Sequence, residues 1–174
     1  MKYTNILSYL LVILLLVTVL TGCADSSSQP EDPLADYVEM LNGDIPEDLR
    51  LTIYYMDPRI LTLRALSAED LISFPETKKI VIESDELLAN FEVFKKLDPS
   101  ELVPAIVTSY INARMYYVLE AGESGKLLEV TISEIRGNVV VNGMEVEFDP
   151  VFYELIEPFW TEEARIMYDW RKET

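Results

Sequence analysis

The chain has 174 residues, with 31 acidic and 14 basic side chains, and its formal net charge is −17 at pH 7. So acidic a protein lacks the basic surface that neutralises phosphates, and we expect no nucleic-acid partner. There is no histidine and only one cysteine, Cys23. These absences exclude histidine-based catalytic triads, the usual zinc sites and disulfides within the chain. We therefore predict no catalytic residues, no cofactor and no metal site, and we do not expect an enzyme.

The first segment has the three-part layout of an export signal. Residues 1–5 are polar with one positive charge, residues 6–20 are almost wholly apolar, and two small residues then precede Cys23. The apolar run has fifteen positions, whereas a helix that spans a bilayer needs about 20. An export signal is therefore favoured, and a short transmembrane anchor is the weaker alternative.

The four residues Leu20-Thr21-Gly22-Cys23 resemble the cleavage site of bacterial lipoprotein precursors. The resemblance implies a signal peptide over residues 1–22 and a lipid on the sulfur of Cys23. It further implies a protein anchored on the extracytoplasmic face of the cell membrane. Residues 23–34 would then be the lipidated cysteine and a flexible acidic tether. The lipid, and not the acidic protein surface, is expected to bind the membrane.

Residues 35–174 are expected to form one globular α+β domain. In the first half of this domain, we expect a helix over 34–41, followed by strands over 49–56 and 60–66 that are joined by a turn at 57–58. Ser67 then caps a helix over 67–73. A strand over 79–83 follows, and Ser84 caps a longer helix that reaches Lys96. Prolines make residues 98–104 irregular.

Two hairpins and two helices are expected in the second half. The hairpins are predicted from turn residues at 122–125 and at Asn142-Gly143, with strands over 112–121, 126–134, 138–141 and 144–148. Asp149-Pro150 begins a helix that Pro158 disrupts, and a last helix follows from Thr161, with Ile166, Met167 and Trp170 as its apolar residues. The fold class is therefore a sheet of about five to seven strands, antiparallel or mixed, with helices packed on it.

Two tyrosine pairs, Tyr54-Tyr55 and Tyr116-Tyr117, lie on predicted strands. Because neighbours in a strand face opposite ways, one ring of each pair should be buried and the other exposed. Cross-strand packing is the favoured interpretation. The alternative is an exposed aromatic interaction surface, for which we nominate Tyr55 and Tyr117.

Other candidate residues are charged or lie in turns. Carboxylates gather near the C-terminus: Glu154, Glu157, Glu162, Glu163 and Asp169. They could hold calcium, but no calcium-loop motif is present, so helix capping is the favoured interpretation.

Arginines lie on or beside predicted elements: Arg50, Arg59, Arg64, Arg114, Arg136 and Arg165. Pairing with carboxylates is favoured for them over a pocket for an anionic ligand. The glycine turns match no phosphate-binding loop.

Three roles are weighed for the domain. The favoured role is a non-enzymatic module that binds another protein of the cell envelope. The second is a small-ligand-binding or sensing domain, because a domain of this size can hold a pocket between helix and sheet. The third is a carboxylate-based hydrolase of wall glycans, for which no pair of residues is nominated.

Overall fold

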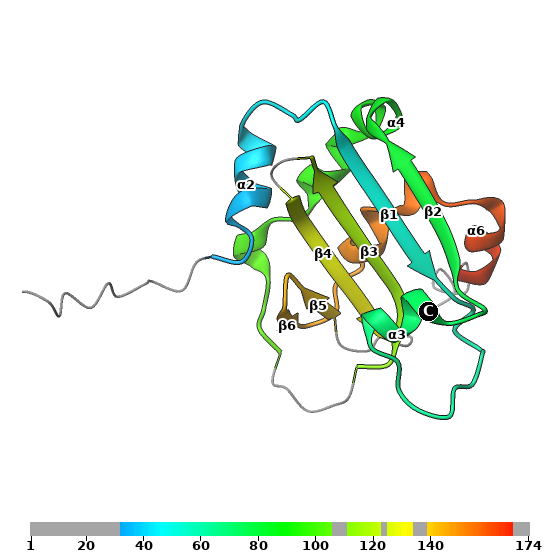
Figure 1. Cartoon of the computed structure of the whole chain (residues 1–174). Coiled ribbons are helices and arrows are strands. Elements are labelled where there is room, and N and C mark those ends of the chain that lie inside the picture. The colour runs from blue at the N-terminus through cyan, green and yellow to red at the C-terminus, as the bar shows by residue number, and fades with distance from the viewer. Residues whose placement is uncertain (1–31, 106–110, 123–124, 134–138, 169–174) are drawn as a thin grey trace, which may run out of the picture. The chain divides into compact units, whose positions relative to one another are not determined.

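One six-stranded sheet organises the part of the chain that the structure describes (Figure 1). The structure is a computed structural model that describes residues 32–105, 111–122, 125–133 and 139–168. Neighbouring strands are all antiparallel, in the spatial order β2-β1-β3-β4-β5-β6. The strands are β1 Leu49–Tyr55, β2 Lys78–Glu83, β3 Ala113–Ala121, β4 Gly125–Ser133, β5 Val139–Val141 and β6 Met144–Val146. The predicted α+β domain with helices on a single sheet is confirmed.

The helices are short, and most of them contribute to the core on one face of the sheet. They are α2 Ala35–Asn42, α3 Ala68–Ser73, α4 Ser84–Ala89, α5 Val151–Glu154 and α6 Glu162–Tyr168, with 3-10 turns η1 Phe91–Lys96, η2 Pro99–Glu101 and η3 Glu157–Phe159. We call the face of the sheet that these elements cover the helix-covered face. Among the helices that the structure describes, only α3 lies on the opposite face, where Leu71 packs in a separate cluster with Tyr116 and Val118. Among the helices of the described ranges, none is both long and apolar enough to cross a membrane.

Alternation along the strands decides which side chains enter the main core. In β1, Leu51, Ile53 and Tyr55 face the helix-covered side, and all are fully buried. Their neighbours in β3 on that face include Tyr117 and Leu119, which are fully buried as well. A strand flanked on one face by helices buries every second residue there, which is the observed pattern.

The predicted strand over residues 60–66 is wrong, because this segment forms an irregular loop. In the structure β1 pairs with β2 on one edge and with β3 on the other. Both hydrogen-bonding edges of β1 are thus occupied, and no edge is left for a hairpin partner that follows directly after Asp57-Pro58. Residues 57–67 instead leave the sheet and return at α3. We call residues 57–67 the leucine loop.

The long helix expected from Ser84 to Lys96 is also wrong in its extent. Helix α4 ends at Ala89, and a 3-10 turn continues to Lys96. The side chain of Asn90 donates from Nδ2 to the carbonyl oxygen of Glu86 at 3.0 Å, so it takes an acceptor that a continuing helix would use. Ser84 is the first helical residue and not the cap, and its hydroxyl donates to the carbonyl oxygen of Leu49 at 3.1 Å.

Both predicted hairpins form. β3 pairs with β4 and β5 pairs with β6. At the second turn Asn142 and Gly143 both have positive φ, 45° and 82°, as a type I′ hairpin requires. Helix α5 lasts one turn and gives way to η3 around Pro158, as expected.

The last helix, α6, differs in its buried face. Its buried residues are Ala164 and Tyr168, whereas Ile166 is 70% exposed, and Trp170 lies outside the described residues. The Tyr168 hydroxyl donates to the carbonyl oxygens of Met56 and Arg114 at 2.9 and 3.1 Å, so it connects α6 to the sheet. A tyrosine can be buried here because its hydroxyl finds backbone acceptors, whereas an isoleucine side chain has no polar group to make this connection.

Candidate interaction surfaces

The structure places the two nominated tyrosines in the core and not on the surface. Tyr55 is 2% and Tyr117 is 0% exposed. The Tyr117 hydroxyl donates to the carbonyl oxygen of Phe152 at 2.8 Å, and the Tyr55 hydroxyl lies 3.2 Å from Oγ1 of Thr161. Burial raises the pKa of Tyr117 well above its ordinary value. The interaction surface nominated at these two residues is therefore wrong.

The favoured interpretation, cross-strand packing, fits the other member of each pair. Tyr54 and Tyr116 are direct partners across β1 and β3, and their rings stack with centroids 5.9 Å apart. Tyr116 is only 7% exposed, and its hydroxyl donates to Glu129 at 2.9 Å. The signal that assigns each ring to its face was present in the sequence, because Tyr55 shares the parity of Leu51 and Ile53 in an alternating strand.

Charged side chains cover much of the opposite face beyond α3. Arg50 of β1 pairs with Glu83 of β2 at 3.4 Å, and Lys126 pairs with Glu129 within β4. Lys79 lies 5.3 Å above the ring of Tyr54. This face therefore resembles an ordinary solvated sheet surface and offers little apolar area to a partner.

The C-terminal carboxylates do not come together as one site. Glu154 pairs with Lys96 at 2.8 Å, and Glu163 pairs with Lys78 at 3.7 Å, so two members of the set bind separate lysines. Asp169 lies outside the described residues. Within the described ranges, no three acidic or cysteine side chains are grouped so that they could hold a metal ion.

Arginines of the described ranges pair with carboxylates, as favoured from the sequence. In addition to Arg50, Arg59 contacts Asp57 and Arg64 contacts Asp70, both at 2.6 Å. Arg165 donates to the carbonyl oxygen of Glu157, and Arg136 lies outside the described residues.

Arg114 has a structural role that the sequence analysis did not assign. Its side chain is buried, and Nη1 donates to Oδ1 of Asn112 at 2.8 Å while Nη2 donates to the carbonyl oxygen of Ile60 at 3.4 Å. The same Asn112 oxygen accepts from the backbone N–H of Leu66 at 3.2 Å. Arg114 and Asn112 thus hold both ends of the leucine loop against the start of β3.

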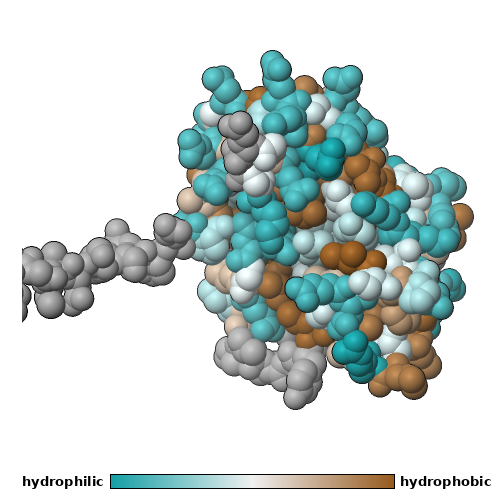
Figure 2. Space-filling view, in the orientation of Figure 1, coloured by the Kyte–Doolittle hydropathy of each residue, from teal (hydrophilic) through white to brown (hydrophobic). Residues whose placement is uncertain are grey.

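The leucine loop presents two fully exposed leucines. Leu61 and Leu63 are 94% and 110% exposed, the highest values among the large apolar side chains in the described part of the chain. The loop projects beyond the sheet in Figure 1, and Figure 2 shows an apolar group at the same corner of the molecule. A cavity of about 540 Å³ between the loop and α3 is lined partly by Leu66, Phe74 and Pro75.

A groove lies beside α2, and we call it the α2 groove. Its volume is about 730 Å³. Apolar side chains from α2, the segment around η2 and β6 form its floor: Val38, Leu41, Leu97, Leu102 and Met144. Polar side chains form its rim: Asn42, Lys95, Asp98 and Ser100. An apolar centre within a polar rim is the usual anatomy of a protein interface.

Two hydrogen bonds fix the walls of the α2 groove. The hydroxyl of Tyr37 on α2 donates to the carbonyl oxygen of Phe94 on η1 at 2.6 Å, and both residues are buried. On the other side, Nδ2 of Asn142 donates to the carbonyl oxygen of Pro33 at 2.6 Å, which connects the start of α2 to the β5–β6 hairpin. The groove is therefore part of the folded architecture and does not depend on an isolated loop.

No protein-family model matches the chain, and neither the curated proteins nor the solved structures contain a significant match.

Proposed function

We propose that this protein is a lipid-anchored lipoprotein of the cell envelope, held on the extracytoplasmic face of the membrane through Cys23, and that its domain is a non-enzymatic protein-interaction module. A segment of a partner protein binds in the α2 groove. The observation that carries the proposal is the apolar floor and polar rim of this groove. The lipid anchor is supported by the sequence Leu20-Thr21-Gly22-Cys23.

A binding role is favoured over catalysis on chemical grounds. The chain has no histidine, and its only cysteine is the residue expected to carry the lipid. Two of the carboxylates considered for acid–base chemistry, Glu154 and Glu163, are paired with lysines. Glycoside hydrolysis uses two carboxylates that face the same bond, whereas Glu154 and Glu163 contact two different lysines.

The α2 groove is suited to a partner segment because its floor is already built and its apolar residues are not fully covered. Val38, Leu41, Leu102 and Met144 are each half-buried. A partner that covers them removes apolar surface from water without a large rearrangement of the domain. The rim residues Lys95 and Asp98 carry opposite charges and would contribute orientation more than affinity.

In-cell photo-cross-linking tests the proposed partner site. A photo-reactive amino acid is placed at Val38 or Leu102 in the groove, and at Ile166 on α6 as a control that is 70% exposed. We expect one dominant protein adduct from the groove positions and none from Ile166. The substitution Met144→Glu should abolish the adduct without lowering the unfolding midpoint by more than a few degrees. Equal labelling from Ile166, or an adduct that Met144→Glu leaves unchanged, would contradict the proposal.

The volume of the α2 groove also supports a second candidate, a small-ligand-binding domain. Ligand sites typically occupy about 300–1,000 Å³, and the groove falls within that range at about 730 Å³. A ligand present at about 100 times its dissociation constant adds about 2.7 kcal/mol to the stability of the folded state. A saturable rise in melting temperature with a metabolite, lost in Met144→Glu, would favour this candidate over a protein partner.

A further inference from the structure

We propose that the leucine loop is a membrane-contact element: Leu61 and Leu63 insert into the interfacial layer of the bilayer on which the protein is anchored, and Arg59 and Arg64 lie at the level of the lipid phosphates. This inference rests on the lipid anchor of the proposed function, but it concerns a different surface from the α2 groove. The anchor determines that the domain stays near the bilayer, whereas the loop determines how the domain is oriented there.

The exposure of the two leucines is built into the fold. Thr62, which lies between them, donates from its hydroxyl to the carbonyl oxygen of Arg64 at 2.8 Å. The buried side chain of Arg114 donates to the carbonyl oxygen of Ile60, just before Leu61. Hydrogen bonds on both sides thus hold a short turn of backbone whose apolar side chains face solvent. Exposed apolar groups on a fixed element indicate a contact surface more strongly than scattered ones do.

The local charge of the loop differs from that of the whole chain. The leucine loop, residues 57–67, contains two arginines and one acidic residue, Asp57, although the chain carries a net charge of −17. The side chains of Arg59 and Arg64 are 80% and 74% exposed. Each contacts one aspartate, but a guanidinium group has five N–H donors and can also bind a phosphate oxygen. The loop is thus suited to approach a phosphate-bearing surface.

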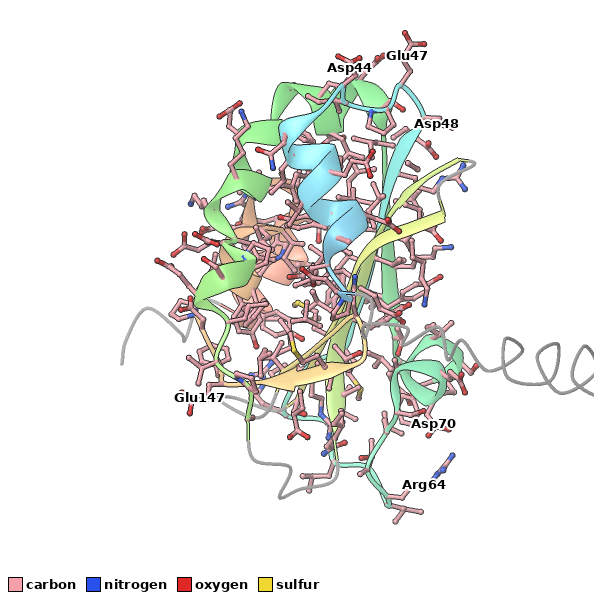
Figure 3. All side chains as sticks on the ribbon, turned by 90° about the vertical axis from the view of Figure 1, so that its left-hand side faces the viewer. Asp44, Glu47, Asp48, Arg64, Asp70 and Glu147 are labelled. Atoms are coloured by element: carbon pink, nitrogen blue, oxygen red, sulfur yellow. The ribbon has the colours of Figure 1, made fainter. Side chains whose placement is uncertain are left out.

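The two ends of the domain differ in their exposed charges. Figure 3 shows Asp44, Glu47 and Asp48 at one end of the domain, and Arg64 together with its partner Asp70 at the opposite end. Anionic lipids repel acidic side chains and attract basic ones, within a range of roughly 10 Å. A domain that meets the bilayer with the leucine loop first keeps this acidic end away from the head groups.

The length of the tether sets how far the domain can lie from its lipid anchor. Asp32 lies nine positions after Cys23 along the chain, and an extended chain spans up to about 3.3–3.6 Å per residue. The resulting reach of roughly 30 Å is about the diameter of a small domain. Tethering also raises the effective concentration of the loop at the bilayer to roughly the millimolar range, so a weak contact is sufficient.

The shape of the loop favours a bilayer over a protein partner. Two exposed leucines on a projecting loop (Figure 1) would need a matching pocket in a protein. A fluid interface accepts a projecting apolar group without a preformed pocket. Amphipathic elements of this kind lie roughly 5–10 Å deep at the boundary between head groups and acyl chains.

The test uses the full, processed lipoprotein reconstituted into protein-free vesicles of phosphatidylethanolamine and phosphatidylglycerol. A fluorescent amino acid replaces Leu63, and in a matched control it replaces Ile166, which is also strongly exposed. Brominated lipids then report contact by quenching. We expect about twofold quenching at position 63, as expected for insertion at the interface, and almost none at position 166. The added substitution Leu61→Ser should reduce the quenching at position 63.

The outcomes separate this inference from the proposed function. Intact-mass measurement shows whether Cys23 carries lipid: a protein without lipid overturns both the anchor and the loop contact. A lipidated protein without quenching at position 63, or with equal quenching at both positions, overturns the loop contact alone. If position 63 is shielded from solvent in native membranes but not in protein-free vesicles, the loop contacts a protein partner. This result would also overturn the inference.

Discussion

The two faces of the sheet carry tyrosines at neighbouring positions but use them differently. On the helix-covered face, Tyr55 and Tyr117 are buried, and each hydroxyl lies within hydrogen-bonding distance of a residue of a C-terminal helix or its flanking turn. On the opposite face, Tyr54 and Tyr116 stack on each other, and Tyr116 bonds a carboxylate within the sheet. The first pair connects sheet to helices, whereas the second connects strand to strand.

This difference shows that a buried tyrosine can serve either of two purposes in the same sheet. A ring between layers stabilises the whole domain, because its burial depends on the helices being in place. A ring on the solvated side stabilises mainly a local strand pairing.

The largest effect is expected from removing a ring on the helix-covered face. Tyr117→Ala should lower the free energy of unfolding by about 3–5 kcal/mol, because it leaves a cavity and an unpaired carbonyl oxygen at Phe152. Tyr54→Ala on the opposite face should cost about 1 kcal/mol or less. Chemical denaturation of both variants measures the difference. Equal costs would mean that the two faces do not differ as argued here.

High pH should unfold the domain through buried tyrosines on both faces of the sheet. Burial raises the pKa of Tyr37, Tyr117 and, on the opposite face, Tyr116 above 10.0, their ordinary value. Below pH 10 both states keep these protons and stability is unaffected, whereas above pH 10 only the unfolded state releases them easily. The free energy of unfolding should then fall by about 1.4 kcal/mol per pH unit for each tyrosine.

A variant with one fewer buried hydroxyl is the control for this pH dependence. Tyr37→Phe should have a shallower slope above pH 10, and it should also be less stable at neutral pH by about 1–3 kcal/mol, because the carbonyl oxygen of Phe94 loses its donor. Denaturation at several pH values reads both effects. An unchanged slope would exclude Tyr37 as one of the titrating groups.

A smaller effect is expected on the opposite face, at the start of α3. Ser67 and Asp70 form a capping box, in which Oγ of Ser67 accepts from the backbone N–H of Asp70 and the carboxylate of Asp70 accepts from the backbone N–H of Ser67. Ser67→Ala should cost about 1 kcal/mol. The hydrogen bonds from Ser67 lower the pKa of Asp70, so its contribution is present at neutral pH and lost as the solution is acidified through that lowered pKa.

Local measurements distinguish this change from global unfolding. Hydrogen exchange should rise in α3 of Ser67→Ala, with little change in β3 and β4, because α3 covers only one end of its face (Figure 1). A uniform rise over the sheet would show that α3 supports the whole fold.

The smallest effect on stability is expected in the leucine loop. Leu61→Ser combined with Leu63→Ser should change the free energy of unfolding by less than about 0.5 kcal/mol, because neither side chain is covered in the folded state. Thermal denaturation of the protein in the absence of lipid checks this. A large loss of stability would show that these leucines pack within the domain and are not available for contact.

Much of the fold was predictable from local patterns. Asn142-Gly143 predicted its hairpin because only residues that tolerate positive φ form that turn. Ser67 predicted the start of α3 through its capping chemistry. The strand expected over residues 60–66 was wrong, because an apolar stretch indicates only a local preference for strand structure. Both edges of β1 are occupied by β2 and β3, which lie farther along the chain.

The candidate surfaces were less predictable. The α2 groove joins residues from three separate parts of the chain, such as Val38, Leu102 and Met144, and no local pattern states that they meet. The sequence pattern predicts that Leu61 and Leu63 belong to a strand. They are exposed because the segment that contains them lies outside the sheet. The burial of Tyr55 was predictable, because it lies on the same face of an alternating strand as Leu51 and Ile53.

Residues close together in the chain were enough to predict the α+β class, the two hairpins and the capped start of α3, and they carry the prediction of a lipid anchor. Which apolar residues remain uncovered depends on the tertiary structure. Covering a side chain requires partners brought from distant segments, and hydrophobic burial is non-directional, so local sequence does not specify the partner. The α2 groove and the leucine loop both arise at this level.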